Sequence, residues 1–325
     1  MAVYKNIDTA RTRRLSRDTF NKVLRPKPIV LSRAISYCVD QPFTVFECES
    51  FLPASEFSEL KSEFPLEVIL TSSEHESFRY RIDEYGHPNL FKDLLSSRPH
   101  LASLVESIQS HIFVRDLLRT FRRPILARLH SKSKFRRTLL RFAPTWVFDI
   151  KVDLTVYSRG FHLTPHTDGI EKVISLLLYF EDPRIEQQHR QETQILGGTK
   201  FWRARSKESE EAWLARLLPA SRSAQRTSYV LSLQLDRKFD QADALSDEFA
   251  EFTTDFVVFH VSKARDNLLA GFVKSSNSWH SVDLSEYPAN VLRGAILINL
   301  NLPPISLRRC ANNFLRQYRL SRFLR

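Results

Sequence analysis

The stretch TPHTDG, residues 164–169, places His166 and Asp168 two positions apart, just before the apolar run KVISLLLYF of residues 172–180. In an extended strand, residues two apart point to the same face, so an imidazole nitrogen and a carboxylate oxygen can reach one cation. Two adjacent ligands leave most of an octahedral shell open, and a metal site therefore needs a third ligand from elsewhere in the chain. The same pair also fits a surface turn in which the two side chains form only local hydrogen bonds.

Short segments rich in Val, Ile, Phe and Leu surround this stretch and predict a β-rich region from about residue 145 onward. These segments are WVFDIKVDLTVYS (146–158), KVISLLLYF (172–180), TKFWRA (199–204), DFVVFHVS (255–262), NLLAGFVKS (267–275), WHSVDL (279–284) and RGAILINLNL (293–302). Several of them alternate apolar with polar residues, which is typical of strands that bury one face.

The chain before residue 145 shows the helical spacing of apolar residues instead. Three segments carry such a stripe, and the last is predicted as one long helix: 53–65, 89–97 and 101–121. A further helix is predicted in SKESEEAWLARLL (206–218), where Ser206 is a suitable N-cap. Helices first and strands afterwards predict an α+β protein in which helices buttress a sheet sandwich or barrel.

Length and composition set broader limits on the class of protein. The 325 residues, 42% of them apolar, suffice for a substantial core and exclude wholesale disorder. No run approaches the ~18 consecutive apolar residues of a membrane span, and the charged N-terminus lacks the apolar segment of a secretory signal. Cys38, Cys48 and Cys310 show no CxxC spacing and cannot all pair within one chain. These features predict a reducing, cytoplasmic location.

The net charge of +11 is concentrated in three segments. Nine Lys or Arg face two Asp in residues 1–36, ten face one acid in residues 114–142, and six Arg face none in residues 307–325. Such clusters favour an anionic partner, which could be a nucleic acid, a phosphorylated substrate or a membrane surface. They are equally typical of a solvated basic face, and no nucleic-acid-binding motif surrounds them.

The ordered set of motifs around the TPHTDG stretch resembles a known family. Tyr157 and Gly160 precede the stretch, GGT (197–199) and SWHSV (278–282) follow the apolar strand, and Arg293 opens the last strand. This order resembles the Fe(II)/2-oxoglutarate-dependent dioxygenases, most closely their prolyl-4-hydroxylase-like branch, which includes the hydroxylases of hypoxia-inducible factor. The resemblance covers roughly residues 145–302.

The resemblance implies a double-stranded β-helix, a jelly-roll or cupin-like barrel, with a metal site at its open end. It implies that His166, Asp168 and His280 are the catalytic metal ligands, a 2-His-1-carboxylate triad for Fe(II). It also implies that Arg293 and Tyr179 bind the far carboxylate of the cosubstrate 2-oxoglutarate, with Tyr157 a weaker candidate for its near end. The implied reaction consumes O₂ and 2-oxoglutarate, releases succinate and CO₂, and hydroxylates a substrate.

Some of these assignments have rivals in the sequence. His260 also lies on a predicted strand, with Lys274 fourteen residues later as an alternative carboxylate partner. We favour His280 because Arg293 opens a clean apolar strand, whereas Lys274 leads into a polar segment. The interval between His280 and Arg293 is a few residues longer than the family's usual spacing. His162 is expected to support the site or to be exposed.

The predicted organisation has four parts. Residues 1–42 form a basic irregular segment, 43–144 a helical supporting region, 145–302 the catalytic core, and 303–325 a basic C-terminal helix. An insertion at about 203–255 within the core is expected to be either a substrate lid or a structural cover for a sheet face. Because Asp168 fills the place that a halide occupies in related halogenases, hydroxylation is the predicted chemistry.

The expected substrate is a small molecule, or an amino-acid, peptide or sugar unit, and an anionic one would suit the basic clusters. One alternative function is oxidative demethylation of a nucleic acid, which the basic clusters would suit. That branch generally carries a second arginine six residues after the first, where this chain has Asn299. The other alternative is a non-catalytic binding protein on the same barrel. A nucleic acid is therefore the less favoured partner, and no integral membrane partner is expected.

Overall fold

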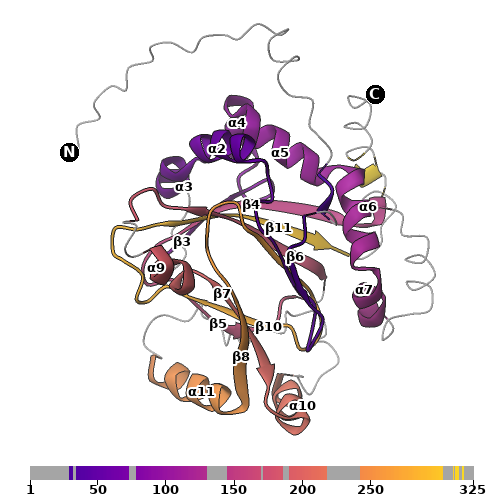
Figure 1. The fold of residues 1–325 in the computed structure, drawn as a ribbon, viewed down its shortest axis with the longest axis vertical. Helices are drawn as coiled ribbons and strands as arrows, with labels where there is room; N and C mark the ends of the chain where they lie inside the picture. The colour runs from indigo at the N-terminus through magenta and orange to yellow at the C-terminus, as the bar shows by residue number, and fades with distance from the viewer. Residues whose placement is uncertain are drawn as a thin grey trace, which may run out of the picture.

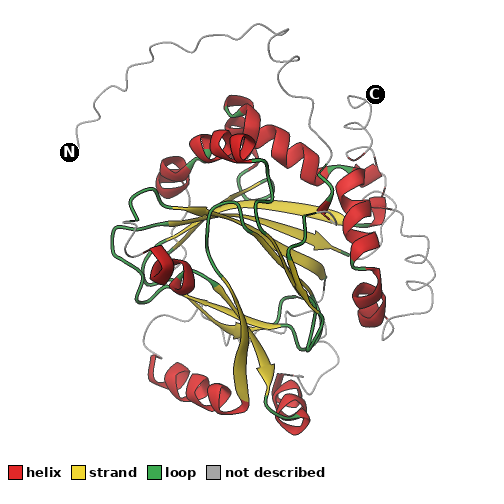
Figure 2. Ribbon diagram, viewed as in Figure 1, coloured by secondary structure: helices red, strands yellow, loops and turns green. Residues whose placement is uncertain are grey.

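Two antiparallel sheets face each other, and helices cover their outer sides (Figures 1 and 2). The computed structural model describes residues 29–31, 34–72, 78–129, 145–169, 171–185, 190–217 and 242–302, with 310, 312–314 and 317. The large sheet has the order β1 (Tyr37–Val39), β2 (Val45–Cys48), β9 (Leu269–Val273), β6 (Lys172–Glu181), β11 (Arg293–Asn301), β4 (Asp149–Tyr157), β3 (Arg79–Asp83). The small sheet has the order β5 (His162–His166), β10 (Trp279–Asp283), β7 (Thr199–Ala204), β8 (Phe256–Ser262).

The order in which the chain visits the two sheets defines the fold. From β4 onward it passes to the small sheet at β5, back to the large sheet at β6, and to the small sheet for β7 and β8. It then returns to the large sheet at β9, crosses to β10 and ends on β11. This is a double-stranded β-helix, so the predicted α+β barrel with supporting helices is confirmed.

Strands also occur before residue 145, where the sequence predicted none. β1, in the predicted irregular segment 1–42, and β2 extend one side of the large sheet through β9, and β3 pairs with β4 at its other side. These strands escape sequence recognition because β1 has only three residues, and β3, RYRID, carries charged residues at alternate positions. The supporting region 43–144 therefore contributes β2 and β3 to the large sheet in addition to its helices, and the segment before it contributes β1.

The helices of the first part of the chain pack on the outer face of the large sheet. Apolar residues of β4, β6 and β11 form one core with buried helix residues such as Phe57, Leu101 and Phe113. The helices are α2 (Ala54–Glu63), α3 (Leu66–Ser72), α4 (Pro88–Ser97), α5 (Pro99–Gln109), α6 (His111–Thr120) and α7 (Arg122–Leu129). The long helix predicted over 101–121 is wrong: it is broken at Ser110, whose hydroxyl accepts a hydrogen bond from the amide of Phe113 and so caps α6.

The insertion covers the outer face of the small sheet. The helices α10 (Lys207–Leu217) and α11 (Ala242–Asp255) lie beside β7 and β8 (Figure 1). They enclose a cluster of buried aromatic residues from both helices and the sheet: Trp202, Trp213, Phe252, Phe256 and Trp279. The sequence left two roles open for this insertion, a substrate lid or a structural cover for a sheet face. The described ends of the insertion form a structural cover, and residues 218–241 lie outside the described chain. The remaining helix, α9 (Arg190–Leu196), precedes β7.

Gly271, on β9, leaves no room for a side chain between the neighbouring strands of the large sheet. A Cβ at this position would lie 2.5 Å from Phe46 Cζ and 2.6 Å from Leu176 Cδ2, the residues opposite it on β2 and β6. We expect Gly271→Ala to lower the free energy of unfolding by about 1–3 kcal/mol, because neighbouring core side chains must shift. Urea unfolding of this variant beside Gly86→Ala, whose Cβ would meet only a side-chain oxygen at 3.2 Å, checks this. Equal midpoints for Gly271→Ala and wild type would contradict it.

Three further observations concern predictions made from the sequence. In the described part of the chain, no helix is long and apolar enough to cross a membrane. Cys38, Cys48 and Cys310 are free thiols. The predicted irregular segment up to residue 28 lies outside the described residues, as does most of the predicted C-terminal helix. Of that helix, Asn313 and Gln317 donate side-chain hydrogen bonds to the carbonyls of Phe148 and Thr145.

Candidate metal centre and anion site

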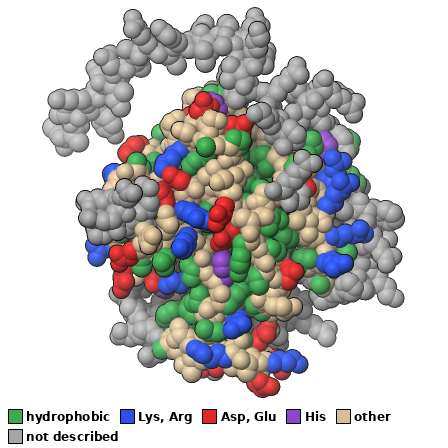
Figure 3. Space-filling model, in the orientation of Figure 1, with side chains coloured by type: hydrophobic (Ala, Val, Ile, Leu, Met, Phe, Trp, Pro, Cys, Tyr) green, Lys and Arg blue, Asp and Glu red, His purple; other side chains and the backbone are tan. Residues whose placement is uncertain are grey.

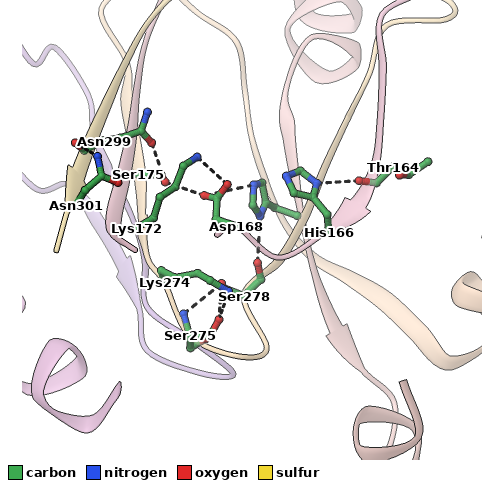
Figure 4. Close-up of polar contacts among 11 residues, drawn as sticks. Thr164, His166, Asp168, Lys172, Ser175, Lys274, Ser275, Ser278, Asn299 and Asn301 are labelled. Atoms are coloured by element: carbon green, nitrogen blue, oxygen red, sulfur yellow. Dashed lines mark hydrogen bonds and ion pairs between the residues drawn. The ribbon is translucent and has the colours of Figure 1, made fainter. Parts of the chain in front are cut away.

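Two neighbouring strands of the small sheet bring the histidines of the predicted triad together. His166 ends β5 and lies directly opposite His280 on β10, with ring centroids 4.2 Å apart. Asp168 follows two residues after His166 (Figure 4). One ligand atom from each of the three side chains lies within 4.8 Å of the others, and all three residues are buried. His280 therefore lies where the third, distant ligand that the sequence required would be.

Hydrogen bonds to the backbone orient both imidazoles. Nδ1 of His166 lies 2.9 Å from the carbonyl oxygen of Thr164, and Nδ1 of His280 lies 3.0 Å from that of Ser278 (Figure 4). Because a carbonyl oxygen only accepts, each Nδ1 carries the proton and each Nε2 keeps a free lone pair. Such second contacts are the usual way in which proteins fix the tautomer of a metal-binding histidine.

Burial keeps these imidazoles neutral. Burial, assisted by the nearby His166, lowers the pKa of His280 to about 3, and burial also lowers the pKa of His166. A histidine must be neutral to bind a metal. His280 therefore stays in the binding form through mildly acidic pH, well below the ordinary histidine pKa of ~6.5, and the pKa of His166 is shifted in the same direction.

A network of polar side chains that sequence reasoning did not predict surrounds Asp168. Lys172 Nζ lies 2.7 Å from Oδ1 of the carboxylate, and Ser175 donates a hydrogen bond of 2.8 Å to Oδ2. The Ser175 hydroxyl also lies 3.2 Å from Oδ1 of Asn299 on β11 (Figure 4). Burial alone would raise the pKa of Asp168, but the Lys172 ammonium beside it holds that pKa well below its usual range. The carboxylate is therefore ionised, as a metal ligand must be.

The donor set suits a divalent cation of the first transition row. Two imidazole nitrogens and one carboxylate oxygen on one side of a site leave several coordination positions open, which is the pattern of non-haem iron sites. Each oxygen of the Asp168 carboxylate accepts one such contact, from Lys172 or from Ser175, and retains a second lone pair for a metal. The residues present thus fit a bound Fe(II).

Arg293 forms a second site inside the same barrel. It opens β11, is 1% exposed, and lies between Tyr157 on β4 and Glu181 on β6. Its guanidinium carbon lies 4.9 Å from the ring centre of Tyr157 and 4.8 Å from that of Tyr179. Within the described chain, none of its three guanidinium nitrogens has a hydrogen-bond partner. Buried charged groups are normally paired, so this guanidinium is suited to binding a carboxylate ligand.

Tyr179 is placed beside this guanidinium by a hydrogen bond between the sheets. Its hydroxyl lies 2.8 Å from the hydroxyl of Thr199 on β7, and burial raises its pKa. Thr199 belongs to the GGT motif. The glycines before it are crowded by protein: a Cβ on Gly198 would lie 2.6 Å from the carbonyl oxygen of Ser262. Gly198 is therefore required at this position by the neighbouring strand β8.

The rival residues have other partners in the structure. His260 is paired with Glu47 at 2.9 Å and stacks on Tyr37, outside the group of metal donors. Lys274 is buried and donates to the carbonyl of Ser275 at 2.6 Å. His162 forms an ion pair of 3.3 Å with Asp283 near the surface. Among the described residues, only the predicted triad brings three metal-binding side chains together.

Comparison with known proteins gives structural neighbours only. No family model matches the chain, and no curated protein sequence matches it. The chain is similar to a Trichoplax adhaerens prolyl hydroxylase solved with a hypoxia inducible factor peptide. The two share 12% identity and a TM-score of 0.36, over 82% of this chain and 86% of that chain. It is also similar to a Pseudomonas putida prolyl-4-hydroxylase. Those two share 13% identity and a TM-score of 0.35, over 79% of this chain and 92% of that chain.

A third similar structure is HygX from Streptomyces hygroscopicus, solved with nickel, 2-oxoglutarate and hygromycin B bound. It shares 11% identity and a TM-score of 0.37, over 79% of this chain and 82% of that chain. The fold itself is defined by the strand order described above.

Proposed function

We propose that this protein is an Fe(II)- and 2-oxoglutarate-dependent dioxygenase that hydroxylates its substrate. The observation that carries the proposal is the presence, in one barrel, of a three-donor metal site and a buried guanidinium without a partner. A cation site alone would fit many binding proteins. A cation site combined with an unpaired arginine fits a ligand that has one end on the metal and a carboxylate at the other.

The residues have distinct roles in this proposal. His166, Asp168 and His280 would hold Fe(II), and Arg293 would pair with the far carboxylate of 2-oxoglutarate, supported by Tyr179 and with Tyr157 beside it. Bound iron, with 2-oxoglutarate and O₂, supplies an oxidative decarboxylation that yields succinate and CO₂ and transfers one oxygen atom to a substrate C–H bond. The chain contributes orientation, charge neutralisation and an enclosure that keeps water out.

The proposed catalytic core spans residues 145–302, and the preceding region supports it with helices and three strands. We propose as substrate a small molecule, or an amino-acid, peptide or sugar unit. Nucleic-acid demethylation is less well supported. At position 299, where that reaction's enzymes carry a second arginine, Asn299 instead shares a hydrogen bond with Ser175 beside Asp168.

The basic clusters give the nucleic-acid alternative only limited support. Of the 114–142 cluster, the part up to residue 129 is described, and its arginines gather on α6 and α7, at one side of the molecule (Figure 3). The cluster at 307–325 lies mostly outside the described residues. Steep loss of substrate turnover above ~0.1 M salt would favour an anionic substrate, because exposed charges are screened at that ionic strength.

The reaction itself can be tested by following 2-oxoglutarate. We expect the iron-loaded protein to release succinate in a reaction that a chelator stops, and a true substrate to increase that release and gain the mass of one oxygen atom. Because Asp168 fills a metal position, no chlorinated or brominated product is expected when halide is added. Methyl loss from a nucleic-acid base would instead support the demethylase alternative. Absence of any 2-oxoglutarate turnover would support the binding protein.

A further inference from the structure

The strand β4 presents polar side chains to the inside of the barrel. Along this strand, Val152, Leu154 and Val156 are buried in the core beneath the helices. The alternate residues Asp153, Thr155 and Tyr157 therefore face the small sheet. Tyr157 confirms this direction, because its ring lies against the guanidinium of Arg293.

One of these groups lacks the hydrogen bond that its burial calls for. Thr155 is 0% exposed, and within the described chain its hydroxyl has no partner. Asp153, two residues before it on the same face, is half-buried. Asp149, on the same strand, accepts a hydrogen bond from the hydroxyl of Tyr85. Buried polar groups are nearly always satisfied, so the unpartnered hydroxyl of Thr155 beside a half-buried carboxylate indicates a place for a ligand.

Solvent exposure decreases along this face of the strand toward Arg293. Lys151 is exposed, Asp153 is partly exposed, and Thr155 and Tyr157 are buried. Leu297, opposite Asp153 on β11, is also partly exposed. Asp153 therefore lies between an exposed end of the strand and the buried site around Arg293.

Asp153 lies among charged side chains. Burial raises the pKa of Asp153, as does the carboxylate of Asp83, which lies directly opposite it on β3. Arg81, on the same strand β3, opposes this rise most strongly, but Arg81 itself pairs with Asp83 at 3.2 Å; Arg79 and Lys172 act in the same direction as Arg81. The carboxylate of Asp153 thus has both cations and a second carboxylate in its vicinity.

We propose that Asp153, with Thr155, binds a protonated nitrogen of the primary substrate, either a primary amine or a guanidinium. Such a group brings several N–H donors and a positive charge, which match a carboxylate and a neighbouring hydroxyl acceptor and would favour the charged form of that carboxylate. The carbon chain that carries the nitrogen then extends toward the metal donors. This inference rests on the proposed function and narrows its substrate to cationic compounds.

The first test compares amines with their neutral counterparts. Cadaverine, agmatine and L-lysine are each supplied beside the N-acetylated form, and succinate release is measured with the iron-loaded protein. We expect at least one free amine to increase succinate release above the uncoupled rate, and acetylation to remove that increase. We expect Asp153→Asn to weaken the response by about 10–150-fold, the usual range for a hydrogen bond to a charged group, and Thr155→Val to weaken it less.

The control variant is Asp149→Asn, a change on the same strand at a carboxylate that already has its own donor. It should respond to the amine as wild type does. Equal stimulation by amines and their acetylated forms, or no stimulation by any amine, would overturn the inference. Uncoupled succinate release by wild-type protein in the same assay would still support the proposed function, and its absence would count against that function as well.

The second test measures stability without any substrate. If Asp153 awaits a ligand, Asp153→Asn removes a half-buried charge and should raise the melting temperature of the metal-free protein. If Asp153 is instead a structural partner of Arg81, the same change should lower the melting temperature, and adding Arg81→Gln should lower it no further. The latter result would overturn the inference.

Discussion

Replacing His166 by alanine is expected to abolish tight metal binding, and Asp168→Ala is expected to do the same. Loss of an outer partner of a metal ligand already costs about 10–100-fold in affinity, so loss of a ligand itself should exceed that range. Anaerobic titration with Fe(II), and with Mn(II) as a stable substitute, measures the affinity directly. Melting temperatures give a second readout, because a metal that binds only the folded protein raises its stability by mass action.

The matched controls are two histidines outside the donor group. His162→Gln changes a partly exposed residue paired with Asp283, and His260→Gln changes the sequence rival paired with Glu47. Both variants should keep wild-type metal affinity. Full metal occupancy in His166→Ala, or its loss in His260→Gln with the fold intact, would show that the triad has been assigned wrongly.

The second large effect is expected at Arg293. Arg293→Met should weaken 2-oxoglutarate binding by about 30- to 5,000-fold, because truncating one partner of a buried charge pair costs about 2–5 kcal/mol. The same variant should be at least as stable as wild type in the absence of 2-oxoglutarate. A guanidinium that is buried without a partner costs desolvation energy, and methionine removes that cost while filling similar space.

Calorimetric titration of 2-oxoglutarate into Mn(II)-loaded protein measures the first effect, and thermal melting of the unliganded protein measures the second. Lys274→Met is the comparison variant and should bind 2-oxoglutarate nearly as wild type does. Unchanged binding in Arg293→Met together with weakened binding in Lys274→Met would move the carboxylate site to Lys274. A large loss of stability in Arg293→Met would show that the arginine is structural.

Much of the barrel could be predicted from the sequence because its strands alternate apolar and polar residues or form short apolar runs. The pattern does not reveal β3, whose arginines face the barrel at a sheet edge. It also does not reveal the break at Ser110, because the apolar stripe continues across it. The capping serine is a sequence signal for a new helix starting at Ser110, but the unbroken apolar stripe favours one continuous helix.

The candidate site shows the same division between local and long-range information. The pair His166 and Asp168 is local, so two-residue spacing sufficed to single it out. The contact of Ser175 with both Asp168 and Asn299 depends on the register between β6 and β11, which no local pattern encodes. The unsatisfied Thr155 is likewise undetectable in sequence, because a buried threonine on a strand usually finds a partner.

The position of Trp279 beside His280 limits how this protein can be engineered. Successive residues of a strand point to opposite faces, so β10 turns one of them into the aromatic cluster with α10 and α11 and the other toward the metal donors. A lid over a barrel mouth can be shortened at the cost of selectivity alone. Deleting α10 and α11 here would expose the back of the strand that holds a metal ligand. Chimeras that exchange this insertion between related barrels should therefore carry the residues of the aromatic cluster with it.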